Sequence, residues 1–145
     1  MLYPDSTEWL RAFNHSLRAD DFVFFNDSLV FGLWHRFLYR STDSGNSYSE
    51  ADQFEGARSL PIRAPDGNLV VGYDSAIRPA ARSEDDGATW TVPDGPDLAL
   101  TPIVLVVIPP TADLPEGRVI GAGYGGIGYS DDNGRTWAPT VFSGG

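Results

Sequence analysis

The chain has 145 residues, no cysteine, and 20 acidic against 10 basic side chains, so its formal net charge is −10 at pH 7. Its length suits one domain, and its 41% hydrophobic content is enough for a core. The lack of cysteine excludes disulfides, thiolate nucleophiles and Cys-based zinc sites. The acidic charge argues against nucleic acid as a partner, and no run reaches the roughly 18 apolar residues that a membrane span needs.

Residues 1–20 differ from the rest of the chain, and we expect them to form an N-terminal extension. They hold two acids before the first base and no uninterrupted apolar stretch, which predicts no signal peptide and leaves the compartment open. Trp9, Leu10, Phe13 and Leu17 fall on one helical face, which favours a short amphipathic helix. The alternative is a strand left over from a preceding repeat, because Trp9 precedes an apolar run much as aromatic residues do further along.

From residue 21 onward the chain consists of three similar units, each with two short apolar runs separated by turn-forming residues. Runs rich in β-branched and aromatic residues predict strands, and the Asn, Asp, Gly and Pro between them predict turns. We therefore expect four short antiparallel strands, A to D, in each unit. Strand A is predicted at about residues 22–25, 58–64 and 102–108, and strand B at about 29–34, 68–74 and 118–124.

The pattern S-x-D-x-G-x-S/T-W/Y occurs near the end of each unit, although chance would produce it on the order of once in a million starting positions. Its residues are Ser41, Asp43, Gly45 and Tyr48, then Ser83, Asp85, Gly87 and Trp90, and finally Ser130, Asp132, Gly134 and Trp137. We expect strand C to end at the serine and strand D to start at the aromatic residue. Four-stranded units that recur at this spacing are typical of β-propeller blades.

The residue types in the pattern predict a tight turn between strands C and D. The Asp carboxylate can accept hydrogen bonds from backbone N–H groups of its own turn, and Gly supplies a positive φ. The Ser or Thr before the aromatic residue is expected to hydrogen-bond across the hairpin. An EF-hand-type calcium loop would need an Asp five residues before the Gly, where this chain has Arg40, Arg82 and Tyr129, so we expect no metal and no cofactor.

The three patterns resemble Asp boxes, the repeats of bacterial neuraminidases that also occur in sialidases, exo-acting glucanases, sortilin-type receptors and photosystem assembly factors. The resemblance covers about residues 20–142. It implies an all-β fold: a partial β-propeller of three four-stranded antiparallel blades, at about 21–54, 55–97 and 98–142. In such families the box lies at the rim of the blade, away from the ligand face, in enzymes and non-enzymes alike.

Propellers generally carry their sites on the loops from strand B to C and from strand D to the next A. The candidate residues for a ligand or partner face there are His35, Arg36, Asp74, Arg78 and Tyr124. A sialidase resembling this family needs three arginines on a carboxylate, a Tyr–Glu pair and an Asp acid/base, and Arg36, Arg78, Tyr124 and Asp74 offer part of that set. A third Arg and a matched Glu cannot be placed, and Pro61-Ile62-Arg63 is the reverse of the Arg-Ile-Pro signature.

We therefore expect a non-catalytic scaffold or binding module with a protein partner, or possible glycan ligand, and keep a segment of a sialidase-like glycoside hydrolase as the alternative. Closed propellers have about four to eight blades, so three would leave two blade faces uncovered. Apolar surface of that kind is normally buried in assembly. We expect two or more copies to assemble side by side, or the chain to dock on a larger protein, and so complete the propeller.

Overall fold

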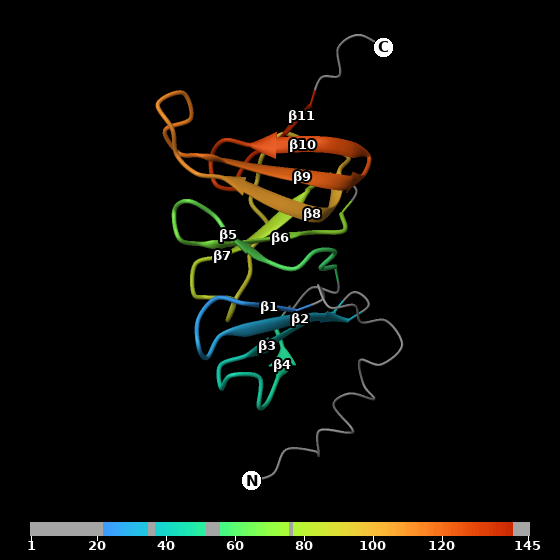
Figure 1. Cartoon of the computed structure of the whole chain (residues 1–145). Coiled ribbons are helices and arrows are strands. Elements are labelled where there is room, and N and C mark those ends of the chain that lie inside the picture. The colour runs from blue at the N-terminus through green and yellow to red at the C-terminus, as the bar shows by residue number, and fades with distance from the viewer. Residues whose placement is uncertain (1–21, 35–36, 52–55, 76, 141–145) are drawn as a thin grey trace.

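The computed structural model describes residues 22–34, 37–51, 56–75 and 77–140, and every regular element among them is a strand (Figure 1). The first sheet contains β1 (Phe22–Phe24), β2 (Val30–Trp34), β3 (Phe37–Ser41) and β4 (Ser49–Glu50). The second contains β5 (Ile62–Arg63), β6 (Leu69–Gly72) and β7 (Ala80–Ser83). The third contains β8 (Thr101–Ile108), β9 (Arg118–Tyr124), β10 (Gly126–Ser130) and β11 (Ala138–Pro139). All pairings are antiparallel between successive strands, which confirms the all-β prediction.

The second sheet is shorter than predicted. We expected four strands in each unit, but this sheet has three, and only an isolated bridge between Arg82 and Thr91 marks the place of the fourth. Pro93 follows two residues later and has no N–H to extend that pairing. Strand A of this unit was predicted at 58–64, yet β5 spans only Ile62–Arg63, since Pro61 interrupts the ladder in the same way. The N-terminal extension, residues 1–20, lies outside the described residues.

Two hydrophobic clusters hold the three sheets in a stack that follows chain order (Figure 1). Side chains alternate between the two faces along β6: Leu69 and Val71 pack toward the first sheet with Phe31, while Val70 packs toward the third with Val119. All of these side chains are fully buried. The run Leu69–Gly72 is therefore continuous in apolar character because both of its faces are covered.

The order of the strands divides the loops between two sides of the stack. Because successive strands are antiparallel, the β1–β2 and β3–β4 connections leave the first sheet at one end, and the β2–β3 connection leaves at the other. The same holds for the other sheets. We call the end with the three S-x-D-x-G loops the repeat-loop side, and the other end, where the candidate ligand face was predicted, the opposite side.

Candidate functional site

The three repeat loops, residues 41–48, 83–90 and 130–137, share one set of hydrogen bonds. In the second loop, Asp85 Oδ1 accepts from the Thr89 backbone N–H at 2.8 Å and from Ser83 Oγ at 2.8 Å. The Ser83 hydroxyl in turn accepts from the Gly87 backbone N–H at 2.7 Å. The equivalent bonds recur in the first and third loops. The predicted acceptance of backbone N–H bonds by the carboxylate is thus confirmed.

The loops differ from prediction in two details. The hydroxyl before the aromatic residue donates to the Asp carboxylate of its own loop, as Thr89 does to Asp85 Oδ2, and not across the hairpin. Two consecutive residues, not the glycine alone, adopt positive φ, for example Asp86 at 55° and Gly87 at 87°. The hydroxyl bonds to the carboxylate because this backbone turn brings the two groups into contact.

These hydrogen bonds fix the charge of the loop carboxylates. Donation by the Ser47 side chain, and then by Ser41, lowers the pKa of Asp43 to about 2. Donation by the side chain and backbone of Thr89 lowers the pKa of Asp85 to about 2. Burial raises the pKa of Asp132, but the hydrogen bonds from Thr136, Ser130 and the Arg135 backbone together outweigh it, and the net shift is downward. Carboxylates with such low pKa values stay ionised near neutral pH and cannot serve there as general acids.

On the opposite side, the structure describes Asp74, Arg78 and Tyr124, whereas His35 and Arg36 lie outside the described residues. Asp74 Oδ2 accepts from Nη2 of Arg58 at 2.8 Å and from its Nε at 3.2 Å. Arg78 Nη1 donates to Asp97 Oδ1 at 2.7 Å. Both arginines are therefore already engaged by carboxylates of the chain.

Among the residues that the structure describes on this side, Tyr124 is the large side chain most open to solvent, with 68% of its surface exposed at the end of β9. It precedes Gly125 and Gly126, whose φ values of 94° and 115° form the tight connection to β10. A Cβ on Gly125 would stand 2.1 Å from the Ala99 carbonyl oxygen, so the backbone needs glycine there. This turn fixes the position of Tyr124 at the end of β9 on the opposite side.

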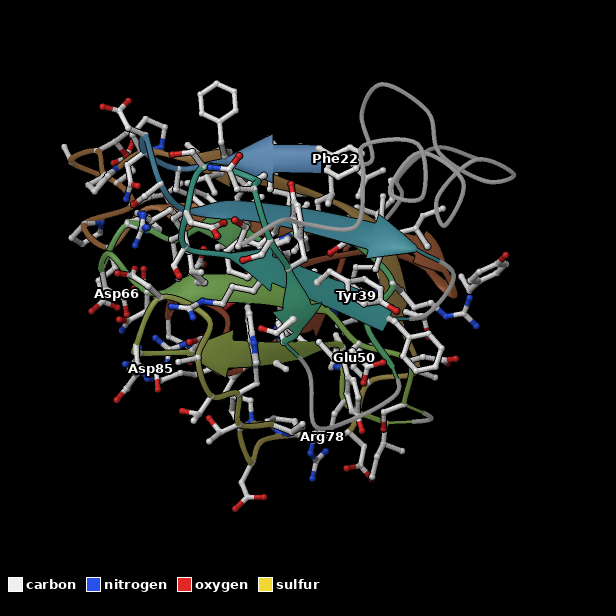
Figure 2. The ribbon with its side chains drawn as sticks, turned by 90° about the horizontal axis from the view of Figure 1, so that it is seen from below. Phe22, Tyr39, Glu50, Asp66, Arg78 and Asp85 are labelled. Atoms are coloured by element: carbon white, nitrogen blue, oxygen red, sulfur yellow. The ribbon has the colours of Figure 1, made fainter. Side chains whose placement is uncertain are left out.

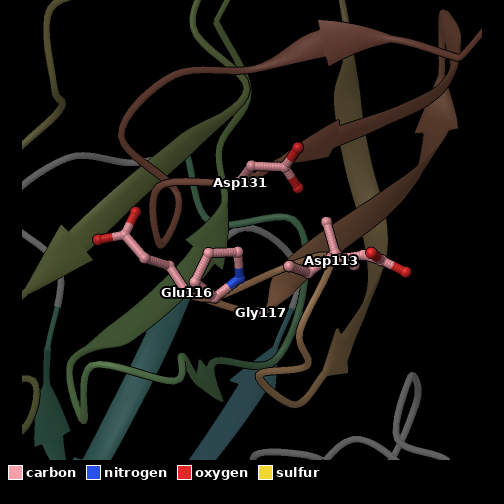
Figure 3. A pocket seen from close by; sticks show the side chains of 6 residues that line it. Asp113, Glu116, Gly117 and Asp131 are labelled. Atoms are coloured by element: carbon pink, nitrogen blue, oxygen red, sulfur yellow. The ribbon is translucent and has the colours of Figure 1, made fainter.

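A depression of about 150 Å³ opens on the repeat-loop side, lined by residues 113–117 and Asp131 (Figure 3). Its carboxylates come from Asp113, Glu116 and Asp131. Arg118 binds both oxygens of Asp131, at 2.7 and 2.9 Å, and this hydrogen bonding lowers the pKa of Asp131. No group of three His, Cys, Asp or Glu side chains in the described ranges is arranged to hold a metal ion.

Among the described residues, large apolar side chains are exposed on the outer faces of the first and third sheets. On the first sheet, Phe24 is 76% exposed, and Phe22 and Tyr39 lie on the face turned toward the viewer in Figure 2. On the third sheet, Val104 and Val106 are 55% and 52% exposed. Contiguous apolar surface of this kind marks interaction sites.

The role of the arginine that precedes two of the three loop serines was not predicted from the sequence. Arg40 Nε donates to the Asp86 backbone carbonyl at 2.9 Å, and Arg82 Nε donates to the Asn133 carbonyl at 2.8 Å. Each bond joins one sheet to the repeat loop of the next. The recurrence of Arg immediately before Ser41 and Ser83 was the available signal.

No protein-family model matches the chain, and a search of curated proteins found no matching sequence. Among solved structures, the chain is similar to an ancestral GH74 enzyme, with a TM-score of 0.67 and 15% identity, over 88% of this chain and 19% of that one. The chain is a partial β-propeller. It spans about a fifth of the length of that enzyme. A second similar structure, YCF48 bound to D1 peptide, has a TM-score of 0.45 and 17% identity, over 83% of this chain and 38% of that one.

The three sheets are accordingly three propeller blades, which we call the first, second and third in chain order. In the part of the chain that the structure describes, we find no helix with the length and apolar character needed to cross a bilayer.

Proposed function

We propose that this chain is a non-catalytic β-propeller module of the Asp-box type that works by assembling with other protein chains. The observation that carries the proposal is the apolar surface on the outer faces of both end blades. In the middle blade, the equivalent faces are fully buried by neighbouring blades, as at Leu69 and Val70. Burying apolar surface is worth roughly 25 cal/mol per Å², which favours covering the outer faces as well.

The Asp-box assignment is supported by the repeat loops. Their shared hydrogen bonds join Ser, Asp and Ser or Thr within each copy, and each pair of positive φ values recurs at the same place. The proposed blades span about residues 21–54, 55–97 and 98–142. The loops form part of the framework, so their Asp residues are proposed to stabilise the blades and not to bind a ligand.

The non-catalytic assignment is supported by the opposite side. An arginine clamp on a substrate carboxylate needs guanidinium groups free to form paired hydrogen bonds. Arg58 and Arg78 are bonded to Asp74 and Asp97 instead. This arrangement gives no support to the alternative, a segment of a sialidase-like glycoside hydrolase.

We propose that the opposite side contacts a protein partner, with His35, Arg36, Asp74, Arg78 and Tyr124 at its centre. Tyr124 offers the exposed aromatic group that protein interfaces favour. The ion pairs of Asp74 and Arg78 hold the loops around it in place.

Two measurements on the full chain test the proposal. Sedimentation velocity at micromolar concentration should give a mass greater than one chain, and a fluorogenic sialoside should not be hydrolysed. A stable monomer would contradict the assembly. Hydrolysis that is lost in Arg36→Ala and Arg78→Ala would establish the enzyme alternative.

A further inference from the structure

The two interfaces between blades within the chain use the same polar contact. Arg40 of the first blade donates to the carbonyl of Asp86, and Arg82 of the second blade donates to the carbonyl of Asn133. Both arginines stand immediately before a loop serine. Both acceptors are the positive-φ residue that precedes the loop glycine, with φ of 55° and 61°.

The same interfaces also share an apolar contact. Phe31 of the first blade lies against Gly87, and Val70 of the second blade lies against Gly134. A Cβ would stand 2.3 Å from the Phe31 ring at Gly87 and 2.9 Å from Val70 Cγ2 at Gly134. The second and third repeat loops therefore each receive a side chain of the preceding blade in the space that the glycine leaves open.

The strand register identifies the corresponding residues of the third blade. Phe31 pairs with Arg40 across β2 and β3, and Val70 pairs with Arg82 across β6 and β7. The matching pair across β9 and β10 is Ile120 and Tyr129. These two residues lie on the outer face of the third blade, which is the last blade that the structure describes.

At the third blade, tyrosine replaces the arginine, but a cation remains at this place. The guanidinium of Arg118 lies 4.3 Å from the centre of the Tyr129 ring and is held by Asp131. The outer face of the third blade therefore presents the aliphatic side chain of Ile120, the phenol of Tyr129 and the guanidinium of Arg118. The internal interfaces present Phe31 or Val70 together with the guanidinium of an arginine.

The first blade carries the complementary half. Ser44 and Gly45 have φ of 65° and 84°, as in the other two loops. Among the described residues, the only side chain that a Cβ on Gly45 would approach is that of Tyr48 in the same loop. Phe31 occupies the space beside Gly87, and Val70 occupies the space beside Gly134. No other blade in the described ranges fills the equivalent space beside Gly45.

We propose that a second copy of this chain docks head to tail, with Ile120 of one copy against Gly45 of the other and Tyr129 beside the Ser44 carbonyl. This inference rests on the proposed assembly function and continues the geometry of the two internal interfaces. Two copies of three blades make a six-bladed ring, inside the range of about four to eight blades, whereas three copies exceed it. Head-to-tail contacts close into such a ring with two equal interfaces.

Cysteine crosslinking tests this register, because the chain has no cysteine of its own. Under mild oxidation, a mixture of Ser44→Cys and Tyr129→Cys chains should form disulfide-linked dimers. Ser44→Cys mixed with Ile77→Cys is the matched control, since Ile77 is exposed on the opposite side, and should stay uncrosslinked. Crosslinking in both mixtures to the same extent would overturn the register.

A second variant shows whether a negative crosslinking result means that the chains associate in another register or that they do not associate at all. Ile120→Glu should reduce association at least tenfold, whereas Ile77→Glu should leave it unchanged. Association that Ile120→Glu does not weaken, without a 44–129 crosslink, would refute the register and leave the proposed function standing. A chain that never associates would refute both.

Discussion

Replacing Arg82 by Met tests how the second and third blades are joined. The Arg82 side chain is 5% exposed and bonds to the Asn133 carbonyl and to Asp66 Oδ2, each at 2.8 Å. A hydrogen bond from a charged group contributes about 1.5–3 kcal/mol. The bond to Asp66 counts for less, because that carboxylate is partly solvated and also lies 3.6 Å from Arg135. We expect Arg82→Met to lower the free energy of unfolding by about 3 kcal/mol.

Arg40→Met is the matched control, because Arg40 makes the equivalent contact to Asp86 from a more exposed place. We expect a loss of about 1 kcal/mol there. With a urea m-value of about 2 kcal/mol/M, the unfolding midpoint should fall by about 1.5 M for Arg82→Met and about 0.5 M for Arg40→Met. Protein concentration must be held fixed, since association adds to stability. Equal losses in the two variants would show that the burial of Arg82 does not strengthen its contact with the third blade.

Three further outcomes are expected. Leu69→Ala, at a fully buried position, should cost about 3 kcal/mol in urea denaturation. The pKa of Asp85 in the folded chain, about 2, is below the usual value of 3.8, so the stabilisation from its ionised form is complete above pH 3.8 and is lost as pH falls through 2. As pH falls from 3.8 to 2, the free energy of unfolding of Asp85→Asn should decrease less than that of the unmodified chain. Gly134→Ala should destabilise the fold more than Gly67→Ala, because both glycines have positive φ but only Gly134 lies against Val70. The melting temperatures of the two glycine variants measure this difference in stability.

The sequence predicted what depends on local residue patterns. The turn of each repeat loop follows from Asp, Gly and a hydroxyl within a few residues, as Asp85, Gly87 and Thr89 show. Strands β2 and β9 lie close to the predicted ranges because their apolar runs end in clear turns. Such features need no knowledge of distant residues.

Contacts between distant residues were not predictable in this way. Arg40 and Asp86 are 46 positions apart, and Arg82 and Asn133 are 51 apart. The recurrence of Arg before the loop serine marks the two donors, but nothing local indicates their acceptors. Arg78 was singled out as a candidate for a ligand face, but its partner Asp97 lies 19 positions further on. Which carboxylate an arginine meets depends on how the blades stack.

Native mass spectrometry of the full chain, sprayed from micromolar solution, tests assembly most directly. We predict a species of two chains that dissociates on dilution and is depleted in Ile120→Glu. A single-chain species at every concentration would contradict it.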